Sequence, residues 1–226
     1  MSTIAAEIGP ETAALASNAL SRKPRQGRSL ASYERMLSAT RKLMLEHGSE
    51  NFTLQDVSDL GNVSIGSIYL RFESKDRLLH AVIADEMQGI IAAEQAMLDG
   101  LIKQCGTLGE FLPLYLERYS SLLEQHSGML HAVMQRAAID PAVSGPGKET
   151  ARRSTKMSVD AIMHYVGEIN GNDPREKAEA AFQTVFAAVA RQFGLGSTPE
   201  SGDEAVWTIM KRELSKMVLA YLRFDG

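Results

Sequence analysis

The feature that most constrains the fold is the segment from residue 32 to residue 79, where three short helical patterns follow one another closely. Gly61 and Asn62 separate the second pattern from the third, and both residues tolerate positive φ, so a tight turn is available there. This arrangement predicts a helix-turn-helix, in which one short helix enters a groove of DNA. The third pattern is the string Val63-Ser64-Ile65-Gly66-Ser67-Ile68-Tyr69-Leu70-Arg71-Phe72.

Capping residues mark the helix ends in this segment. Ser32 is the expected N-cap of the first helix, and Gly48 supplies a left-handed stop after residue 47. Thr53, followed three residues later by Asp56, predicts a capping box at the second helix, and Ser64 predicts a cap for the third. The predicted inward-facing residues of the second helix are Leu54, Val57 and Leu60.

The rest of the chain is also predicted to be helical. A fourth helix begins after Ser74, and its apolar stripe is long enough to join the N-terminal unit to the C-terminal part of the chain. No run alternates with period two over a useful length, so no sheet is expected. A loop is expected at residues 144–147, and two long amphipathic helices close the chain. The predicted fold is all-α, with an N-terminal three-helix helix-turn-helix domain joined through the fourth helix to a helical C-terminal domain that dimerises.

The expected division of the chain is an arm at 1–28, the helix-turn-helix domain at 29–79 and the C-terminal domain at 80–226. The arm is rich in Ala and Ser and ends in a basic cluster, where Pro24 and Gly27 discourage regular structure. A flexible, basic-tipped arm of this kind contacts phosphates or a minor groove, or else it is a solvated tail that touches nothing.

The charge distribution supports a nucleic-acid partner better than the net charge of −4 does. Residues 22–80 carry ten basic and seven acidic side chains, so this segment is +3 and the remainder is −7. A basic N-terminal part joined to an acidic remainder indicates that one end of the protein meets a polyanion and the other does not.

Several classes of protein are disfavoured. The longest apolar runs are far shorter than the ~18 residues of a membrane span, and the first thirty residues lack a secretory signal, so a cytoplasmic protein is expected. The single cysteine, Cys105, forms no internal disulfide and is interpreted as an apolar filler rather than a redox sensor. The five histidines show no metal-ligand spacing, and no phosphate loop or nucleophile motif is present. We therefore expect no enzyme, no catalytic residue, no metal and no cofactor.

Specificity is expected to reside in the third helix, whose small or polar side chains can meet base edges, with Gly66 allowing close approach to the duplex. Tyr69 and Lys75 are candidates for phosphate contacts, as is Thr53. Tyr69 could instead be a packing ring, Lys75 a solvated charge and Thr53 a cap only, and Arg71 is either a DNA contact or solvent-facing. The DNA-binding candidates are Arg28, Thr53, Ser64, Ile65, Gly66, Ser67, Tyr69, Leu70, Arg71 and Lys75.

Five features of residues 32–79, about a fifth of the chain, occur together in one order: Glu46-His47-Gly48, Phe52-Thr53, Val57, Val63-Ser64-x-Gly66-x-x-Tyr69-x-x-Phe72 and Ser74-Lys75-x-x-Leu78-Leu79. In these features the segment resembles the DNA-binding domain of the TetR family of bacterial transcriptional regulators. The segment departs from the usual family pattern at Ser58, where alanine is common, and at Gly61-Asn62 in the turn. The resemblance implies a helical homodimer that binds a palindromic operator, usually as a repressor, and is released when a small molecule binds the C-terminal domain.

Methionine and aromatic residues in the middle helices suggest a deformable cavity for a small apolar or aromatic effector, although each residue could simply be core. The pocket candidates are Phe111, Tyr115, Tyr119, Met129, Met134, Met157, His164 and Tyr165. The last two helices, with alanines that permit close approach, are expected to form the homodimer interface rather than only a monomeric core. The interface candidates are Phe182, Val185, Val189, Met210, Leu214, Met217 and Tyr221.

The acidic remainder keeps a second hypothesis open. A helix-turn-helix protein could act as an activator, or as a helical protein-interaction module with weak DNA affinity, because non-specific DNA binding depends on phosphate neutralisation.

Overall fold

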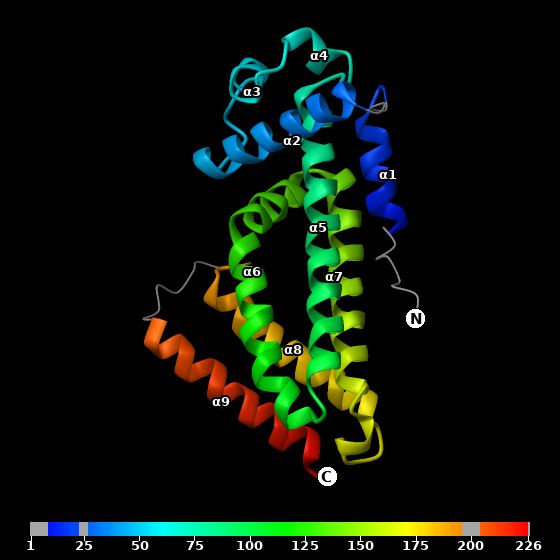
Figure 1. Cartoon of the computed structure of the whole chain (residues 1–226), viewed down its shortest axis with the longest axis vertical. Coiled ribbons are helices and arrows are strands. Elements are labelled where there is room, and N and C mark those ends of the chain that lie inside the picture. Colours follow the sequence, from blue (N-terminus) through cyan, green and yellow to red (C-terminus); the bar gives the residue numbers. More distant parts are fainter. Residues whose placement is uncertain (1–8, 23–26, 196–203, 226) are drawn as a thin grey trace. The chain divides into compact units, whose positions relative to one another are not determined.

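The computed structural model describes residues 9–22, 27–195 and 204–225, and every regular element in these ranges is helical (Figure 1). The all-α prediction is confirmed. None of the helices in these ranges is long and apolar enough to cross a membrane. In chain order the elements are α1 (Pro10–Ala19), α2 (Arg28–His47), α3 (Leu54–Gly61), α4 (Ile65–Tyr69), α5 (Lys75–Gln104), α6 (Leu108–Ile139), α7 (Pro141–Met163), the 3₁₀ turn η1 (Val166–Glu168), α8 (Pro174–Gln192) and α9 (Glu204–Arg223).

The chain folds into two compact units. The first, here called the HTH unit, is formed by Glu7–Gly89 and Gly128–Thr150, and the second, the C-terminal unit, contains Ile90–Ser127 and Ala151–Gly226. Helices α5, α6 and α7 each contribute one part to each unit. The domain boundaries expected at residues 28 and 79 remain a prediction, because the two compact units meet within α5, α6 and α7 and not at these residues.

The capping signals of the HTH unit act as the sequence predicts. Gly48 ends α2 at φ 58°, and the Thr53 hydroxyl accepts from the Asp56 N–H while the Asp56 carboxylate accepts from the Thr53 N–H. Asn62 follows α3 in the left-handed region at φ 47°, and the Ser64 hydroxyl caps α4. These local bonds satisfy backbone groups that each short helix leaves free at its ends, and thereby fix the helix-turn-helix.

The core of the HTH unit lies under α2, α3, α4 and the start of α5. Ile68 and Phe72 anchor α4 to it and are fully buried, and Tyr33 of α2 stacks on Phe72 with the ring centroids 6.2 Å apart. The inward orientation predicted for Leu60 is wrong, because this side chain is 42% exposed near the end of α3. Other buried members of this core include Met36, Leu37, Leu43, Met44, Phe52, Val57, Leu78, Leu79 and Val82.

Three boundaries differ from the sequence prediction because tertiary packing overrides local turn signals. Helix α1 forms inside the segment expected to be an irregular arm, and Thr12 in α1 donates its N–H and hydroxyl to Glu149 at 2.9 and 3.1 Å. Helix α2 begins at Arg28 rather than after Ser32. Residues 144–147 lie within α7 instead of forming a loop, and both Val143 and Pro146 there are buried. Most of the arm's basic cluster, at 23–26, lies outside the described residues.

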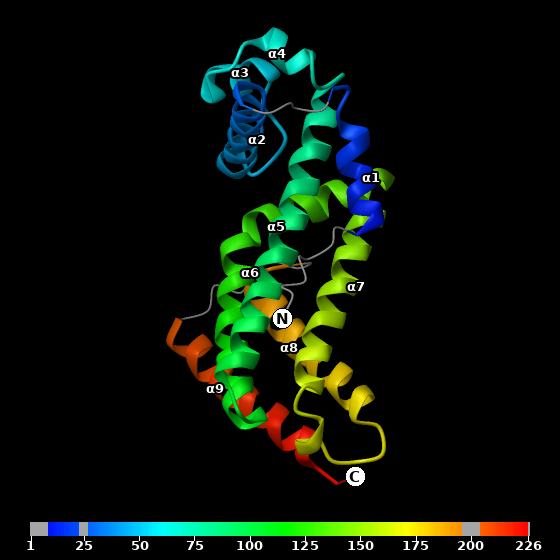
Figure 2. The same cartoon turned by 45° about the vertical axis from the view of Figure 1, so that its right-hand side comes forward.

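In the C-terminal unit, α8 and α9 pack against each other as an antiparallel pair, which is seen in two views (Figures 1 and 2). Trp207, the only tryptophan in the sequence, lies in the first turn of α9. Its indole N–H donates to the Ser120 hydroxyl of α6 at 3.1 Å, and its ring meets Phe193 edge-on at 6.2 Å. The start of α9 is therefore attached to α6 and to the end of α8.

Candidate DNA-binding interface

Helix α4 has one buried side and one exposed side. Ile68 points into the core, whereas Ser64, Gly66, Tyr69 and Leu70 are exposed and Tyr69 retains 58% of its accessible surface. Ile65 and Ser67 are half-buried, and the Ser64 and Ser67 hydroxyls share a hydrogen bond of 2.7 Å. The exposed side thus combines hydroxyls, apolar surface and one glycine, which suit contacts to base edges and phosphates.

Gly66 is not required by packing within the protein. A Cβ atom added there would meet no other atom within 4 Å, and the backbone is not in the left-handed region. A glycine inside a helix lowers its stability by about 1 kcal/mol relative to alanine. Packing within the protein does not explain this loss at Gly66. The absence of a side chain at Gly66 leaves the helix backbone uncovered at this exposed position.

The turn before α4 is fixed by a residue at which the sequence departs from the TetR pattern. Ser58 donates its hydroxyl to the Val63 carbonyl at 2.6 Å, and its own carbonyl accepts from the Val63 N–H at 3.1 Å. Gly61 serves packing rather than turn conformation, because a Cβ there would lie 3.2 Å from the Arg35 carbonyl oxygen and 3.3 Å from the Ala39 methyl. Asn62 alone supplies the left-handed residue of this turn.

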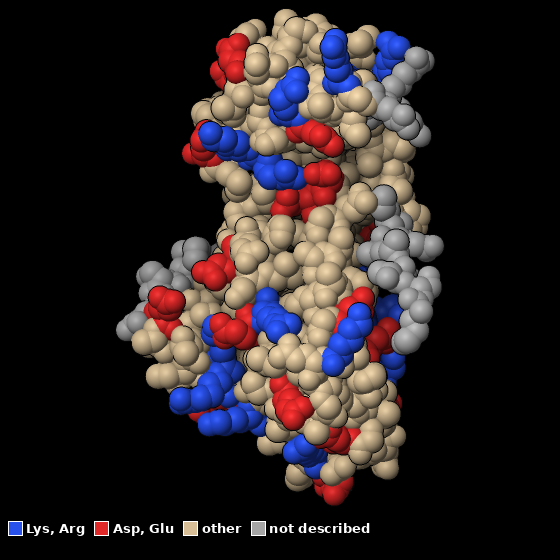
Figure 3. All heavy atoms as spheres, viewed as in Figure 1, with Lys and Arg blue, Asp and Glu red and all other residues tan. Residues whose placement is uncertain are grey.

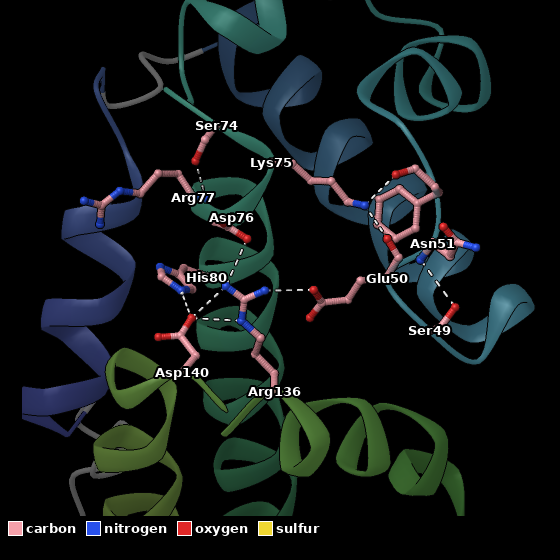
Figure 4. Close-up of polar contacts among 11 residues, drawn as sticks. Ser49, Glu50, Asn51, Ser74, Lys75, Asp76, Arg77, His80, Arg136 and Asp140 are labelled. Atoms are coloured by element: carbon pink, nitrogen blue, oxygen red, sulfur yellow. Dashed lines mark hydrogen bonds and ion pairs between the residues drawn. The ribbon is translucent and has the colours of Figure 1, made fainter. Parts of the chain in front are cut away.

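The three basic residues predicted to bind DNA differ in their surroundings: Arg28 is exposed, whereas Arg71 and Lys75 bond to groups within the protein. Arg28, in the first turn of α2, is exposed, but Arg71 is buried and donates one guanidinium nitrogen to the Ser29 carbonyl at 2.8 Å and to the Ser29 hydroxyl at 3.0 Å. The Lys75 ammonium donates to the carbonyls of Glu50 and Phe52 and lies 4.3 Å from the centre of the Phe52 ring (Figure 4). Arg71 and Lys75 thus hold the unit together, and Arg71 does not face solvent.

A polar cluster that sequence reasoning missed connects the end of α6 to the loop before α3 (Figure 4). Arg136 of α6 donates to Glu50 at 2.8 Å, to Asp76 at 2.9 Å and to Asp140 at 2.8 Å. His80 of α5 shares a hydrogen bond of 2.7 Å with the same Asp140 oxygen. No sequence signal joins these residues, because the partners lie as far as 86 positions apart.

Asp140 is the most perturbed carboxyl of this cluster. Burial raises its pKa, but hydrogen bonds from His80, Arg136 and the Ala142 N–H more than offset that effect and lower the pKa to about 2. The Asp140 carboxylate consequently stays ionised at neutral pH and pairs with Arg136.

Charge is mixed over the surface of the HTH unit. Figure 3 shows basic and acidic side chains beside one another on the face that it presents. The site is therefore identified by the shape and exposure of α4 rather than by a uniform basic patch on this face.

A family model for bacterial regulatory proteins of the tetR family matches residues 36–82, which include α3, α4 and the start of α5. Residues 36–82 are a DNA-binding domain of the TetR family. Members of this family bind DNA and are not enzymes, which confirms both the DNA-binding and the non-enzymatic expectation.

Solved structures of TetR-family proteins share this fold. A transcriptional regulator assigned to the TetR family from Mesorhizobium loti matches with a TM-score of 0.69 at 16% identity, over 87% of this chain and 98% of the other. A TetR transcription regulator from Haloarcula marismortui gives 0.60 at 15% identity, over 84% and 96%. The fatty acid degradation regulator FadR from Bacillus halodurans gives 0.58 at 14%, over 89% and 100%. No curated protein matched the chain in sequence.

The residues predicted to bind a ligand fall into separate groups. Phe111, Tyr115 and Tyr119 form a buried stack along α6, with ring centroids 5.4 and 5.3 Å apart, and Tyr165 lies 5.2 Å from Phe111. Half-buried Met157 and exposed His164 belong to the same C-terminal unit. The two remaining candidates belong to the HTH unit, with Met129 buried in its core and Met134 exposed.

The predicted interface residues of α8 and α9 lie on two different faces. One set is buried within the single chain and belongs to its own core: Phe182, Val185, Val189 and Leu214. The other set is exposed, and further exposed apolar side chains accompany it. We refer to these exposed side chains collectively as the α8–α9 apolar surface: Phe186, Val206, Ile209, Met210, Met217, Tyr221 and Phe224.

Proposed function

We propose that this regulator binds a palindromic operator as a homodimer, with α4 of each subunit in the major groove, and represses transcription until a small apolar or aromatic molecule binds its C-terminal domain. The observation that carries the proposal is the exposed side of α4, opposite the fully buried Ile68. In this proposal the DNA-binding domain comprises residues 29–79, the ligand-binding and dimerisation domain comprises residues 80–226, and the protein acts in the bacterial cytoplasm.

The proposed DNA surface combines direct and backbone contacts. Ser64, Gly66 and Tyr69 of the α4 region, with half-buried Ile65 and Ser67 and exposed Leu70 beside them, would face the groove. Thr53 and Arg28, which are both exposed, would contact phosphates. Arg71 is left out because its guanidinium is buried against Ser29. Lys75 is assigned a positioning role, since its ammonium holds the loop before α3.

The exposed apolar surface supports the homodimer. Met210, Met217 and Tyr221 recur along α9 at a spacing that keeps them on one side of the helix, and this side does not face the core of its own chain. Exposed apolar patches of this kind mark interaction sites, and a twofold interface would cover the same patch on both subunits.

Release by a ligand is supported by helices that belong to both units. Because α5, α6 and α7 each run from one unit into the other, a ligand that displaces them in the C-terminal unit also acts on their ends in the HTH unit. In the HTH unit, Arg136 of α6 pairs with Glu50 and Asp76, on either side of the helix-turn-helix in sequence.

A mobility-shift experiment with DNA from upstream of the protein's own operon tests the proposal. The wild-type protein is expected to form a sequence-specific complex at moderate salt. Gly66→Leu is expected to abolish this complex because the added side chain blocks close approach of the duplex, and a Cβ at this position meets no atom of the protein within 4 Å. Gly167→Leu is the matched control, because a Cβ at Gly167 also meets nothing within 4 Å. Failure of the wild-type protein to form a specific complex would contradict the proposal.

The same promoter fused to a reporter distinguishes the alternative of an activator. Reporter output should rise when the gene is deleted if the protein is a repressor, and fall if it is an activator. A protein-interaction module with weak DNA affinity would leave the reporter unchanged.

A further inference from the structure

A buried acidic side chain in the C-terminal unit has no cationic partner among the described residues. Glu94 of α5 is 1% exposed, and its Oε1 accepts from the hydroxyls of Ser154 at 2.9 Å and Ser158 at 3.0 Å, both on α7. Burial raises the pKa of Glu94, and the two serine hydroxyls offset this only in part. The Glu94 carboxyl is thus buried in surroundings that disfavour its charged form.

Stacked aromatic rings lie next to this carboxyl. The Tyr115 hydroxyl donates to the Ser158 hydroxyl at 2.9 Å, so that a chain of hydrogen bonds runs from α6 through α7 to Glu94 on α5. Tyr115 and Tyr119 stack on each other, and both rings are buried. Faces of aromatic rings attract organic cations, and most strongly where water is excluded.

The core alone does not require an ionisable group at this position. A glutamine of the same shape would accept the same two serine hydrogen bonds without the desolvation cost that a carboxylate incurs. A carboxyl supplies what glutamine does not, which is a negative charge for a ligand that carries a positive one. An anionic ligand, by contrast, would meet a group of the same charge.

We propose that Glu94 is the anionic end of the effector site, and that the effector is a protonated amine on an aromatic or apolar body. The ammonium pairs with the Glu94 carboxylate, and the apolar body lies against the Tyr115 and Tyr119 rings. This inference rests on the proposed function, in which a ligand of the C-terminal domain controls DNA binding, and it narrows the ligand class from apolar or aromatic to cationic.

Calorimetric titration of the full-length protein tests the inference directly. The probes are phenylalkylamines of increasing chain length, each compared with the corresponding alcohol and carboxylate. We expect at least one amine to bind more tightly than its alcohol and its carboxylate, and Glu94→Gln to weaken that amine by about tenfold or more, since a charge-assisted contact is lost. Glu124→Gln, which changes an exposed carboxyl on α6, should leave the affinity unchanged.

The inference fails if no amine in the series binds more tightly than its alcohol, or if Glu94→Gln leaves amine affinity unchanged. Proton release on amine binding, obtained from titrations in buffers of different ionisation enthalpy, should disappear in Glu94→Gln if the carboxyl ionises when the amine binds. Circular dichroism of the same variant shows whether its fold is retained.

Mobility shifts separate this inference from the proposed function. If an amine binds to the wild-type protein but not to Glu94→Gln, and does not release DNA, the amine site at Glu94 is supported. The claim that this ligand controls DNA binding is then contradicted. If an uncharged molecule releases the wild-type protein and Glu94→Gln equally, ligand release stands and the role of Glu94 is refuted.

Discussion

Tyr69 and Lys75 lie close in the sequence, but their side chains have opposite surroundings. Tyr69 is largely exposed on α4 and has no polar or ring partner in the part of the chain that is described. The Lys75 ammonium is committed to the carbonyls of Glu50 and Phe52 and to the Phe52 ring. A contact with DNA therefore costs Tyr69 nothing within the protein, whereas Lys75 would have to leave three partners.

At the residue scale we predict that Tyr69→Ala weakens operator binding roughly tenfold while changing the free energy of unfolding by less than about 0.5 kcal/mol. Lys75→Ala should instead destabilise the protein by about 1–2 kcal/mol, because two carbonyls lose a charged donor. Operator titrations and urea unfolding of both variants measure these effects. Unchanged operator affinity of Tyr69→Ala would place the recognition surface elsewhere.

At the scale of elements, the end of α6 is attached to the HTH unit through one guanidinium. Arg136, whose side chain is 12% exposed, joins the loop before α3 at Glu50 to the first turn of α5 at Asp76. Asp140, between α6 and α7, holds Arg136 in place with His80 on its other side. The position of α6 is thus linked to both ends of the helix-turn-helix segment.

We predict that Arg136→Met lowers the free energy of unfolding by about 2 kcal/mol, because three carboxylates lose a shared cation. Arg175→Met, which removes exposed ion pairs to Asp160 and Glu179, should cost less than about 1 kcal/mol. Urea unfolding at neutral pH compares the two variants. An equal loss in both would show that the Arg136 cluster is no stronger than a surface pair.

The same cluster predicts a pH dependence. Because the folded-state pKa of Asp140 lies below its ordinary value of 3.8, at about 2, its stabilising effect is complete above pH 4 and is lost as the pH falls toward 2. Wild-type stability should therefore decline more steeply than that of Arg136→Met in this interval. Parallel curves of unfolding free energy against pH would exclude a role for this pair.

Elements were predictable where their signals are local. The caps at Thr53 and Ser64 and the stop at Gly48 act within one helical turn, so the helix-turn-helix and its exposed helix α4 follow from the sequence. The Arg136 cluster has no local signal, since its partners come together only when the chain has folded. At Pro146 a strong local signal gave a wrong prediction. The sequence predicted a loop at residues 144–147, but this segment is helical and Pro146 is buried in α7.

At the scale of the whole molecule, α8 and α9 are apolar on more than one side. Helical periodicity identifies the apolar residues but does not tell which side packs within the chain, and the predicted interface combined the two. The buried side, which includes Phe182 and Leu214, closes the core of the C-terminal unit. The exposed side, which includes Met217 and Tyr221, remains for another subunit in the proposed dimer.

We predict that Met217→Glu converts the dimer to a monomer and leaves the thermal midpoint of the monomer's own fold nearly unchanged, because this side chain is 65% exposed. Leu214→Glu should instead reduce helicity and stability, since it buries a charge in the core. Sedimentation velocity and circular dichroism distinguish the two results. If Met217→Glu sediments as the wild type does, the interface does not include this part of α9.

The fluorescence of Trp207 can report dissociation of the proposed dimer and unfolding of the C-terminal unit without an added label. Because it is the only tryptophan, every change in indole emission comes from one site, where α9 begins against Ser120 of α6 and Phe193. Val206 and Met210 of the α8–α9 apolar surface lie close to it in the same helix. The unmodified protein therefore contains an optical reporter for the proposed subunit association and for movement of α9 relative to α6.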